Sequence, residues 1–205
     1  MSNPTQAAEF EIGEKQYRFE VLVDPDPQSP RENDNLGTML YNHRRYVLGD
    51  DLIKFGSFEE YLDSANLAAE EVVSLPLYLL DHSGLSISTT DFHDQWDSAC
   101  VGVIYTTFDK IKKEYNVSEV DLDLIERVGN VLDSEVSEFN TYLNKEIYGF
   151  RLCEKNAEGQ WNEVESGWNF YGSDVSENGM LEYLDTEIAE TVVQHLARPA
   201  PRRLK

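Results

Sequence analysis

One segment near the middle of the chain constrains the fold most, because its apolar residues recur at steps of three and four. They are Val120, Leu124, Val128, Val131, Leu132, Val136 and Phe139. This spacing places one apolar stripe along a helix. Ser118 followed by Asp121 is typical of a helix N-terminus, and the pattern runs to about Leu143. The sequence therefore predicts a long helix near 119–143 that packs this stripe on a core.

Strand patterns on both sides of this segment predict a sheet for the helix to cover. Residues 9–23 alternate apolar and polar around a Gly-Glu-Lys turn, which is typical of a β-hairpin. Residues 99–107, ACVGVIYTT, are nearly all apolar and suit a central strand buried on both faces. Residues 146–153 and 161–172 predict an antiparallel pair that extends the sheet. We expect an α+β fold, with a mixed, mainly antiparallel sheet and packed helices.

Three more helices are predicted, one of them a short helix at FDKIKKEY, residues 108–115. Ser57 with Glu60 has the pattern of a capping box, and helical spacing continues to Val73, after which Pro76 ends the helix and opens a strand. Residues 180–197 predict a closing C-terminal helix.

The predicted domain boundaries lie at a proline-rich loop near residue 33 and at the start of a Pro- and Arg-rich tail at residue 198. Residues 1–33 form the hairpin and a proline-rich loop, and residues 34–197 form the main α+β domain. Residues 198–205, rich in Pro and Arg, form a flexible basic tail.

Charge constrains the partners. The chain has 39 Asp and Glu against 17 Lys and Arg, a formal net charge of −22. Four of these bases lie in the last eight residues, so residues 1–197 carry −26. Such a field argues against direct binding of nucleic acid, because that affinity depends mainly on Lys and Arg at phosphates.

Three interpretations of this acidity compete. The chain is an acidic protein with no special partner, a protein adapted to high salt, or one whose surface imitates nucleic acid and docks on a basic groove. Salt adaptation is disfavoured because 23 Glu exceed 16 Asp. Mimicry is favoured by acids at helical spacing, about 5–6 Å apart, which resembles phosphate spacing. The candidate partner-binding residues are Glu119, Asp123, Glu126, Asp133, Glu135 and Glu138 on the long helix, and Glu182, Asp185, Glu187 and Glu190 near the C-terminus.

Residues 75–107 offer the alternative of an active site. Asp81, His82, His93 and Asp97 are residue types that bind metals, and Cys100 with a histidine could act as a thiol nucleophile. The two histidines are eleven residues apart, which is not the close pair typical of a zinc site. The favoured interpretation is therefore that these aspartates cap turns and that Cys100 is buried in its strand.

Other features bear on chemistry and location. NHRRY, residues 42–46, is expected to form internal ion pairs rather than a phosphate site. No glycine-rich phosphate loop is present, so we expect no cofactor.

The longest apolar stretch, Leu75–Leu80, is too short to cross a membrane, and the N-terminus lacks a signal-peptide pattern. We expect a cytoplasmic protein with two free cysteines.

Four phrases of the sequence resemble a family of small proteins encoded by bacteriophages and other mobile elements of bacteria. They are DNLGTMLYNHRRYVLGD (34–50), LPLYLLDHSGLSISTTDFHDQWDSACVGVIYTT (75–107), EIYGFRL (146–152) and SGWNFYG (166–172). Relatives often have a cysteine where this chain has Gly167. The family has no assigned reaction, so no catalytic residue carries over.

The resemblance implies a phage or plasmid protein that acts in the cytoplasm of a bacterial host. The leading hypothesis is an anti-defence protein that occupies the basic groove of a restriction or CRISPR complex, without catalysis. The alternative is a small metal-dependent or thiol enzyme that acts on a nucleotide or nucleic acid, centred on Asp81–Asp97. A third is a phage protein that oligomerises.

Overall fold

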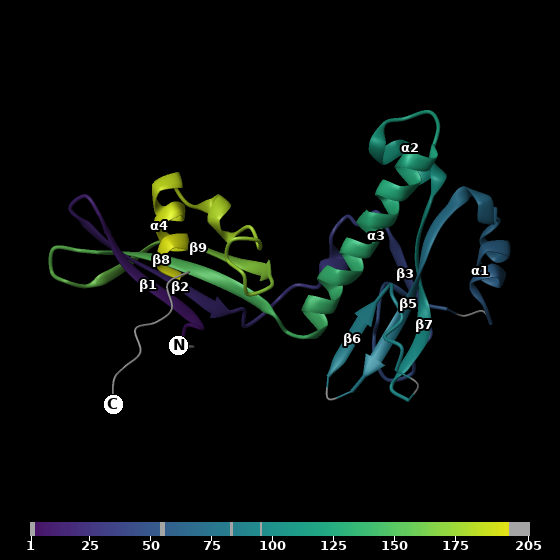
Figure 1. Cartoon of the computed structure of the whole chain (residues 1–205), viewed down its shortest axis with the longest axis horizontal. Coiled ribbons are helices and arrows are strands. Elements are labelled where there is room, and N and C mark those ends of the chain that lie inside the picture. The colour runs from purple at the N-terminus through teal and green to yellow at the C-terminus, as the bar shows by residue number, and fades with distance from the viewer. Residues whose placement is uncertain (1–2, 54–55, 83, 95, 197–205) are drawn as a thin grey trace. The chain divides into compact units, whose positions relative to one another are not determined.

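The computed structural model describes residues 3–53, 56–82, 84–94 and 96–196 (Figure 1). Its contacts divide the chain into two compact units. Unit 1 contains residues 1–28 and 145–205, and unit 2 contains residues 29–144. Each unit has a sheet and a hydrophobic core of its own.

Unit 2 is built on a five-stranded sheet in the order β4-β3-β7-β5-β6. The strands are β3 (Thr38–Tyr41), β4 (Asp51–Leu52), β5 (Val72–Asp81), β6 (Leu85–Ser88) and β7 (Ser98–Thr107). Only β3 and β4 pair in parallel; the other neighbours are antiparallel. The α+β class predicted from the sequence is therefore confirmed.

Helices cover both faces of this sheet (Figure 1). The long helix α3 (Leu122–Leu143) packs Val128, Leu132 and Val136 on one face, where the main core of unit 2 lies. On the other face, α1 (Phe58–Ala65) packs on a smaller cluster that includes Val103 and Tyr105. The short helix α2 (Phe108–Tyr115) follows β7 directly, and two 3₁₀ turns, η1 (Pro30–Glu32) and η2 (Ala69–Glu71), complete the unit.

The long helix matches its sequence pattern closely, with one difference at its start. Asp121 is the N-cap, and its carboxylate accepts a hydrogen bond from the Leu124 amide at 2.9 Å. Ser118 and Glu119 therefore precede the helix. An aspartate at the N-cap is favoured because it satisfies an amide that has no partner within the helix.

The prediction that a helix continues from Ser57 to Val73 is wrong for the second half of that segment. Helix α1 ends at Ala65, because Asn66 takes a left-handed conformation with φ of 56° and caps the C-terminus. The strand β5 then starts at Val72, so Pro76 lies inside it rather than before it. Proline is tolerated there because β6 pairs only with Tyr78–Asp81, which leaves one side of Pro76 without a neighbouring strand.

Unit 1 has a four-stranded antiparallel sheet in the order β1-β2-β8-β9. The strands are β1 (Gln6–Ile12), β2 (Lys15–Val23), β8 (Ile147–Lys155) and β9 (Trp161–Tyr171). Helix α4 (Thr186–Leu196) lies over this sheet (Figure 1), and a 3₁₀ turn, η3 (Met180–Tyr183), precedes it. The core contains Phe19 and Phe150, whose rings stack 5.6 Å apart.

The predicted hairpin and the predicted pair of late strands are both present, but their partners differ from the prediction. Strand β8 pairs with β2 of the N-terminal hairpin and does not extend the sheet of unit 2. The two units accordingly differ from the predicted division, in which residues 34–197 formed one main domain. The break near residue 28 lies in the proline-rich loop, whereas the break near residue 144 had no sequence signal. The predicted tail, 198–205, lies outside the described residues.

Candidate functional site

The acids predicted on the long helix have different surroundings. Asp123, Glu126 and Asp133 are exposed on α3, and Glu119 is exposed before it. Asp133 accepts a hydrogen bond from the Thr89 hydroxyl. The only base on α3, Arg127, lies over the ring of Tyr115, 5.4 Å from its centroid. The N-terminal half of α3 therefore presents the carboxylates of Asp123 and Glu126 to solvent.

Glu135 differs from the other predicted acids, because its side chain is only 11% exposed and lies in an ion pair. Its carboxylate pairs with Arg31 Nη1 at 3.0 Å and accepts hydrogen bonds from the amides of Leu36 and Gly37. Arg31 also forms a bidentate pair with Asp50, at 2.9 and 2.7 Å. The Arg31 side chain is only 7% exposed. Glu135 thus holds the start of unit 2 against α3, a role that its place on a charged helix face did not indicate.

The pKa values around Arg31 follow from this packing. Burial alone would lower the pKa of Arg31, but the hydrogen bonds and charges of Asp50 and Glu135 outweigh it and raise that pKa. Glu138 lies one turn further along α3 and is half-buried. Burial, and secondarily the charge of Glu135, raise the pKa of Glu138, while Arg31 opposes the shift. Glu138 is therefore a poor candidate for a free surface charge.

Replacing Glu138 with glutamine is expected to stabilise the protein at neutral pH. A carboxyl whose pKa is higher in the folded chain than in the unfolded chain favours folding less as pH rises, because the unfolded chain ionises first. We expect Glu138→Gln to raise Tm by about 1–2 °C at pH 7. The gain should vanish below pH 4.5, the ordinary pKa of the group. Thermal melts of both proteins across pH check this, and a gain that does not depend on pH would contradict it.

The C-terminal acids belong to unit 1. Glu182 lies in η3, Asp185 precedes α4, and Glu187 and Glu190 lie on α4; all four are exposed, as predicted for surface residues. Their helix packs its apolar face on the sheet through Val192, which is fully buried. The ten predicted acids therefore divide between the two units.

The sequence patterns described above did not single out one long interval of unit 2 that has acids but no bases. Between Lys54 and Lys110 the chain contains no Lys or Arg. The acids in this interval are all exposed, namely Glu59, Glu60, Asp63, Glu70, Glu71, Asp81, Asp91, Asp94, Asp97 and Asp109. Glu59, Glu60 and Asp63 lie on α1, and Glu70 and Glu71 lie in η2. The sequence signal that identifies them is the absence of bases over a long interval, not helical spacing.

The second group of candidates, in residues 81–100, is only partly brought together. His82 Nδ1 lies 2.7 Å from the Asp97 carboxylate, and the Asp81 amide donates to the Asp97 carbonyl at 3.0 Å. The Asp81 carboxylate accepts a hydrogen bond from Tyr46 Oη at 3.2 Å and lies 3.7 Å from Arg45. NHRRY therefore forms an ion pair within the chain, as expected, but this pair is exposed on the surface. His93 lies instead beside Asp91, at 3.7 Å.

This geometry gives metal chemistry no support. Within the described residues, no three His, Cys, Asp or Glu side chains are placed to hold a metal ion together. Asp91 and Asp94 instead accept hydrogen bonds from amides two or three residues later, which confirms the predicted turn-capping role.

Cys100 is exposed rather than buried, which corrects the prediction. It lies beside Tyr78 at the start of β7, before the strand enters the cluster under α1. With His93 it lines an open depression of about 510 Å³, and its thiol points toward the Gly102 carbonyl at 3.8 Å. A carbonyl oxygen does not remove the thiol proton, so this contact does not activate a nucleophile.

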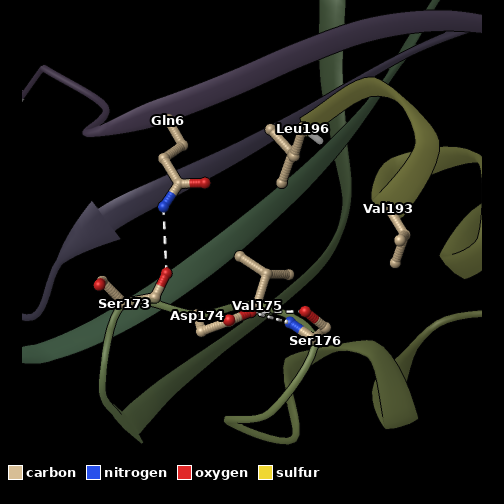
Figure 2. A pocket seen from close by; sticks show the side chains of 7 residues that line it. All are labelled: Gln6, Ser173, Asp174, Val175, Ser176, Val193 and Leu196. Atoms are coloured by element: carbon tan, nitrogen blue, oxygen red, sulfur yellow. Dashed lines mark hydrogen bonds between the residues drawn. The ribbon is translucent and has the colours of Figure 1, made fainter. Parts of the chain in front are cut away.

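Figure 2 shows a pocket of unit 1, of about 410 Å³, between the N-terminal strand and α4. Its polar groups bind one another: Gln6 Nε2 donates to the Ser173 carbonyl at 3.0 Å, and Asp174 accepts from the Ser176 amide and hydroxyl. The hydrogen bonds from Ser176 lower the pKa of Asp174. These pairings account for the carboxylate without any ligand.

Comparison of the chain with family models, curated proteins and solved structures gave no match. In the described part of the chain, no helix combines the length and the apolar character needed to span a bilayer.

Proposed function

We propose that this chain is an acidic binding protein that occupies a basic, nucleic-acid-binding groove on a bacterial defence complex of the restriction or CRISPR type. The sequence resemblance supplies the setting, in which a phage or another mobile element encodes the protein and it acts in the host cytoplasm. The observation that carries the proposal is an interval of the sequence in unit 2, residues 55–109, which contains ten exposed acids and no Lys or Arg. From outside this interval, Arg45 lies 3.7 Å from Asp81.

The positions of these acids support a fixed charge pattern rather than a diffuse one. Glu59, Glu60 and Asp63 lie on a helix whose N-cap, Ser57, accepts a hydrogen bond from the Glu60 amide. Carboxylates held on ordered elements keep their spacing when a partner approaches, so less conformational entropy is lost on binding. Glu59 is ionised over a wide pH range, because hydrogen bonds of its carboxylate, chiefly to its own backbone and also to Ser57, lower its pKa.

The negative charge of the protein also affects the rate at which it is expected to associate with a basic partner. A surface potential of this kind steers association with a basic cleft and makes the rate strongly dependent on ionic strength. The same field repels DNA and RNA, so the partner is a protein. Acids on α1 and α3 lie over opposite faces of the unit 2 sheet, so the variant that tests the proposal changes acids near both helices.

The test is capture of partners from bacterial lysate by wild-type protein and by two variants with equal net charge. The four-site variant changes Asp63→Asn, Glu70→Gln, Asp123→Asn and Glu126→Gln. The scattered variant changes Glu11, Glu14, Glu158 and Glu163 to Gln, all exposed in unit 1. We expect wild type and the scattered variant to capture a DNA- or RNA-handling complex that dissociates as salt rises. The four-site variant should bind that complex about tenfold more weakly, since each lost contact removes a fraction of a kcal/mol.

Equal capture by all three proteins would contradict the proposal, because net charge or some other surface would then account for binding. Equal loss in both variants would contradict it as well, since a docking surface requires particular acids.

A further inference from the structure

Trp96 is the most exposed large apolar side chain in the part of the chain that the structure describes, at 91%. It lies in unit 2, in the loop between β6 and β7. A tryptophan is a large, flat apolar surface with one hydrogen-bond donor, and such residues are enriched at the centres of protein interfaces. The core of unit 2 does not include this side chain.

The backbone that carries Trp96 is ordered by its neighbours. Asp94 accepts hydrogen bonds from the amides of Trp96 and Asp97, both at 2.9 Å. Asp97 is in turn held by His82 and by the amide of Asp81. These contacts order the backbone that carries the indole and do not involve the indole itself. Preorganised display of an apolar group lowers the entropy lost when a partner binds it.

Carboxylates precede and follow Trp96 in the loop, and two of them lie beside histidines: Asp97 beside His82 at 2.7 Å and Asp91 beside His93 at 3.7 Å. Asp91, Asp94 and Asp97 are exposed, and Lys and Arg are absent from residues 55–109. Hydrogen bonds from the amides of Asp97 and Trp96 lower the pKa of Asp94, so this acid stays ionised well into the acidic range. A flat aromatic ring flanked by negative charges has the chemistry of a nucleotide in a single strand, in which an unpaired base is flanked by phosphates.

Single strands and duplexes are bound by different surfaces. Proteins that hold a single strand combine a basic groove with aromatic side chains on which successive bases stack, largely without regard to sequence. Proteins that bind a duplex contact phosphates and the edges of bases, and offer no stacking position for an isolated ring. An exposed indole therefore discriminates between these two kinds of groove.

We propose that the loop of residues 91–94 and 96–97 docks in the groove of a protein that binds single-stranded nucleic acid. Trp96 takes the position of a stacked base, and Asp91, Asp94 and Asp97 take the positions of phosphates. This inference rests on the proposed function and narrows its partner from any basic groove to one that accepts single strands.

The test is displacement of a fluorescent oligothymidylate from a purified single-strand-binding protein of the OB-fold class, with this protein as competitor. Wild type is expected to displace the oligonucleotide. Trp96→Ala should compete about 10- to 100-fold less well, the range expected from losing one stacked ring, whereas Trp96→Phe should keep most of the competition. Leu122→Ala is the matched control, because Leu122 is 82% exposed elsewhere in unit 2 and should compete like wild type.

The results separate this inference from the proposed function. No displacement by wild type, or equal displacement by wild type and Trp96→Ala, overturns the inference. If Trp96→Ala also leaves lysate capture intact while the four-site variant loses it, the proposed function stands and only the inference fails. If neither variant loses capture, both fail.

Discussion

Arg31→Met is expected to lower the free energy of unfolding by about 3–5 kcal/mol, because it leaves two partly buried carboxylates without their counter-ion. Arg31 donates to Asp50, to Glu135 and to the Gly37 carbonyl, with donor–acceptor distances of 2.7–3.0 Å. Asp50 and Glu135 are only 26% and 11% exposed in their side chains. Methionine fills a similar volume, so the loss reports the charge rather than a cavity.

The consequence should be local to unit 2, because this cluster joins three of its segments. Asp50 also accepts from the Met39 amide at 2.7 Å, and Glu135 accepts from the Leu36 amide at 2.7 Å. Urea denaturation followed by circular dichroism measures the change. Arg45→Met is the control, since the Arg45 side chain is 73% exposed and lies 3.7 Å from Asp81, and it should have little effect. A loss below about 1 kcal/mol for Arg31→Met would contradict the assigned role.

Phe150→Ala is expected to cost about 3–5 kcal/mol through the core of unit 1. Phe150 is fully buried at the centre of β8, and its ring lies 5.6 Å from Phe19 and 5.8 Å from Phe170. Alanine removes the ring that these two aromatics share and leaves a cavity that the rigid strands cannot close. The same denaturation experiment measures the loss.

Val164→Ala on the neighbouring strand β9 is the matched control for this prediction. Val164 is 50% exposed, so its replacement should change stability by no more than about 0.5 kcal/mol. If Phe150→Ala were as mild as Val164→Ala, the four-stranded sheet and α4 would not share the core described here.

Much of the fold could be predicted because local patterns specify it. The apolar stripe of α3 and the alternating hairpin of β1 and β2 each encode an element within one stretch of chain. The end of α1 was missed because residues 67–73 have helix-forming composition, whereas the left-handed Asn66 ends the helix in a single residue. The pairing of β8 with β2 was missed because the partner of a strand lies far away in sequence and leaves no local signal.

In the candidate site too, features set by neighbouring residues were predictable and features set by distant residues were not. The turn-capping aspartates were predictable from neighbouring residues, as were the exposed acids of the C-terminal helix. The burial of Glu135 was not, because its partner Arg31 is 104 residues away and resembles any other surface base in the sequence. The exposure of Cys100 was not predictable either, since it depends on where α1 covers the sheet.

The central claim is that the acidic surface of unit 2 takes the place of nucleic acid in a basic groove. The most direct test is competition between this protein and labelled nucleic acid for the purified complex that it captures, repeated over a range of salt concentrations. We expect wild type to displace the nucleic acid, with an affinity that falls steeply as salt rises, and the four-site variant to displace it poorly. A ternary complex in which the nucleic acid stays bound, or an affinity that does not change with salt, would contradict the account.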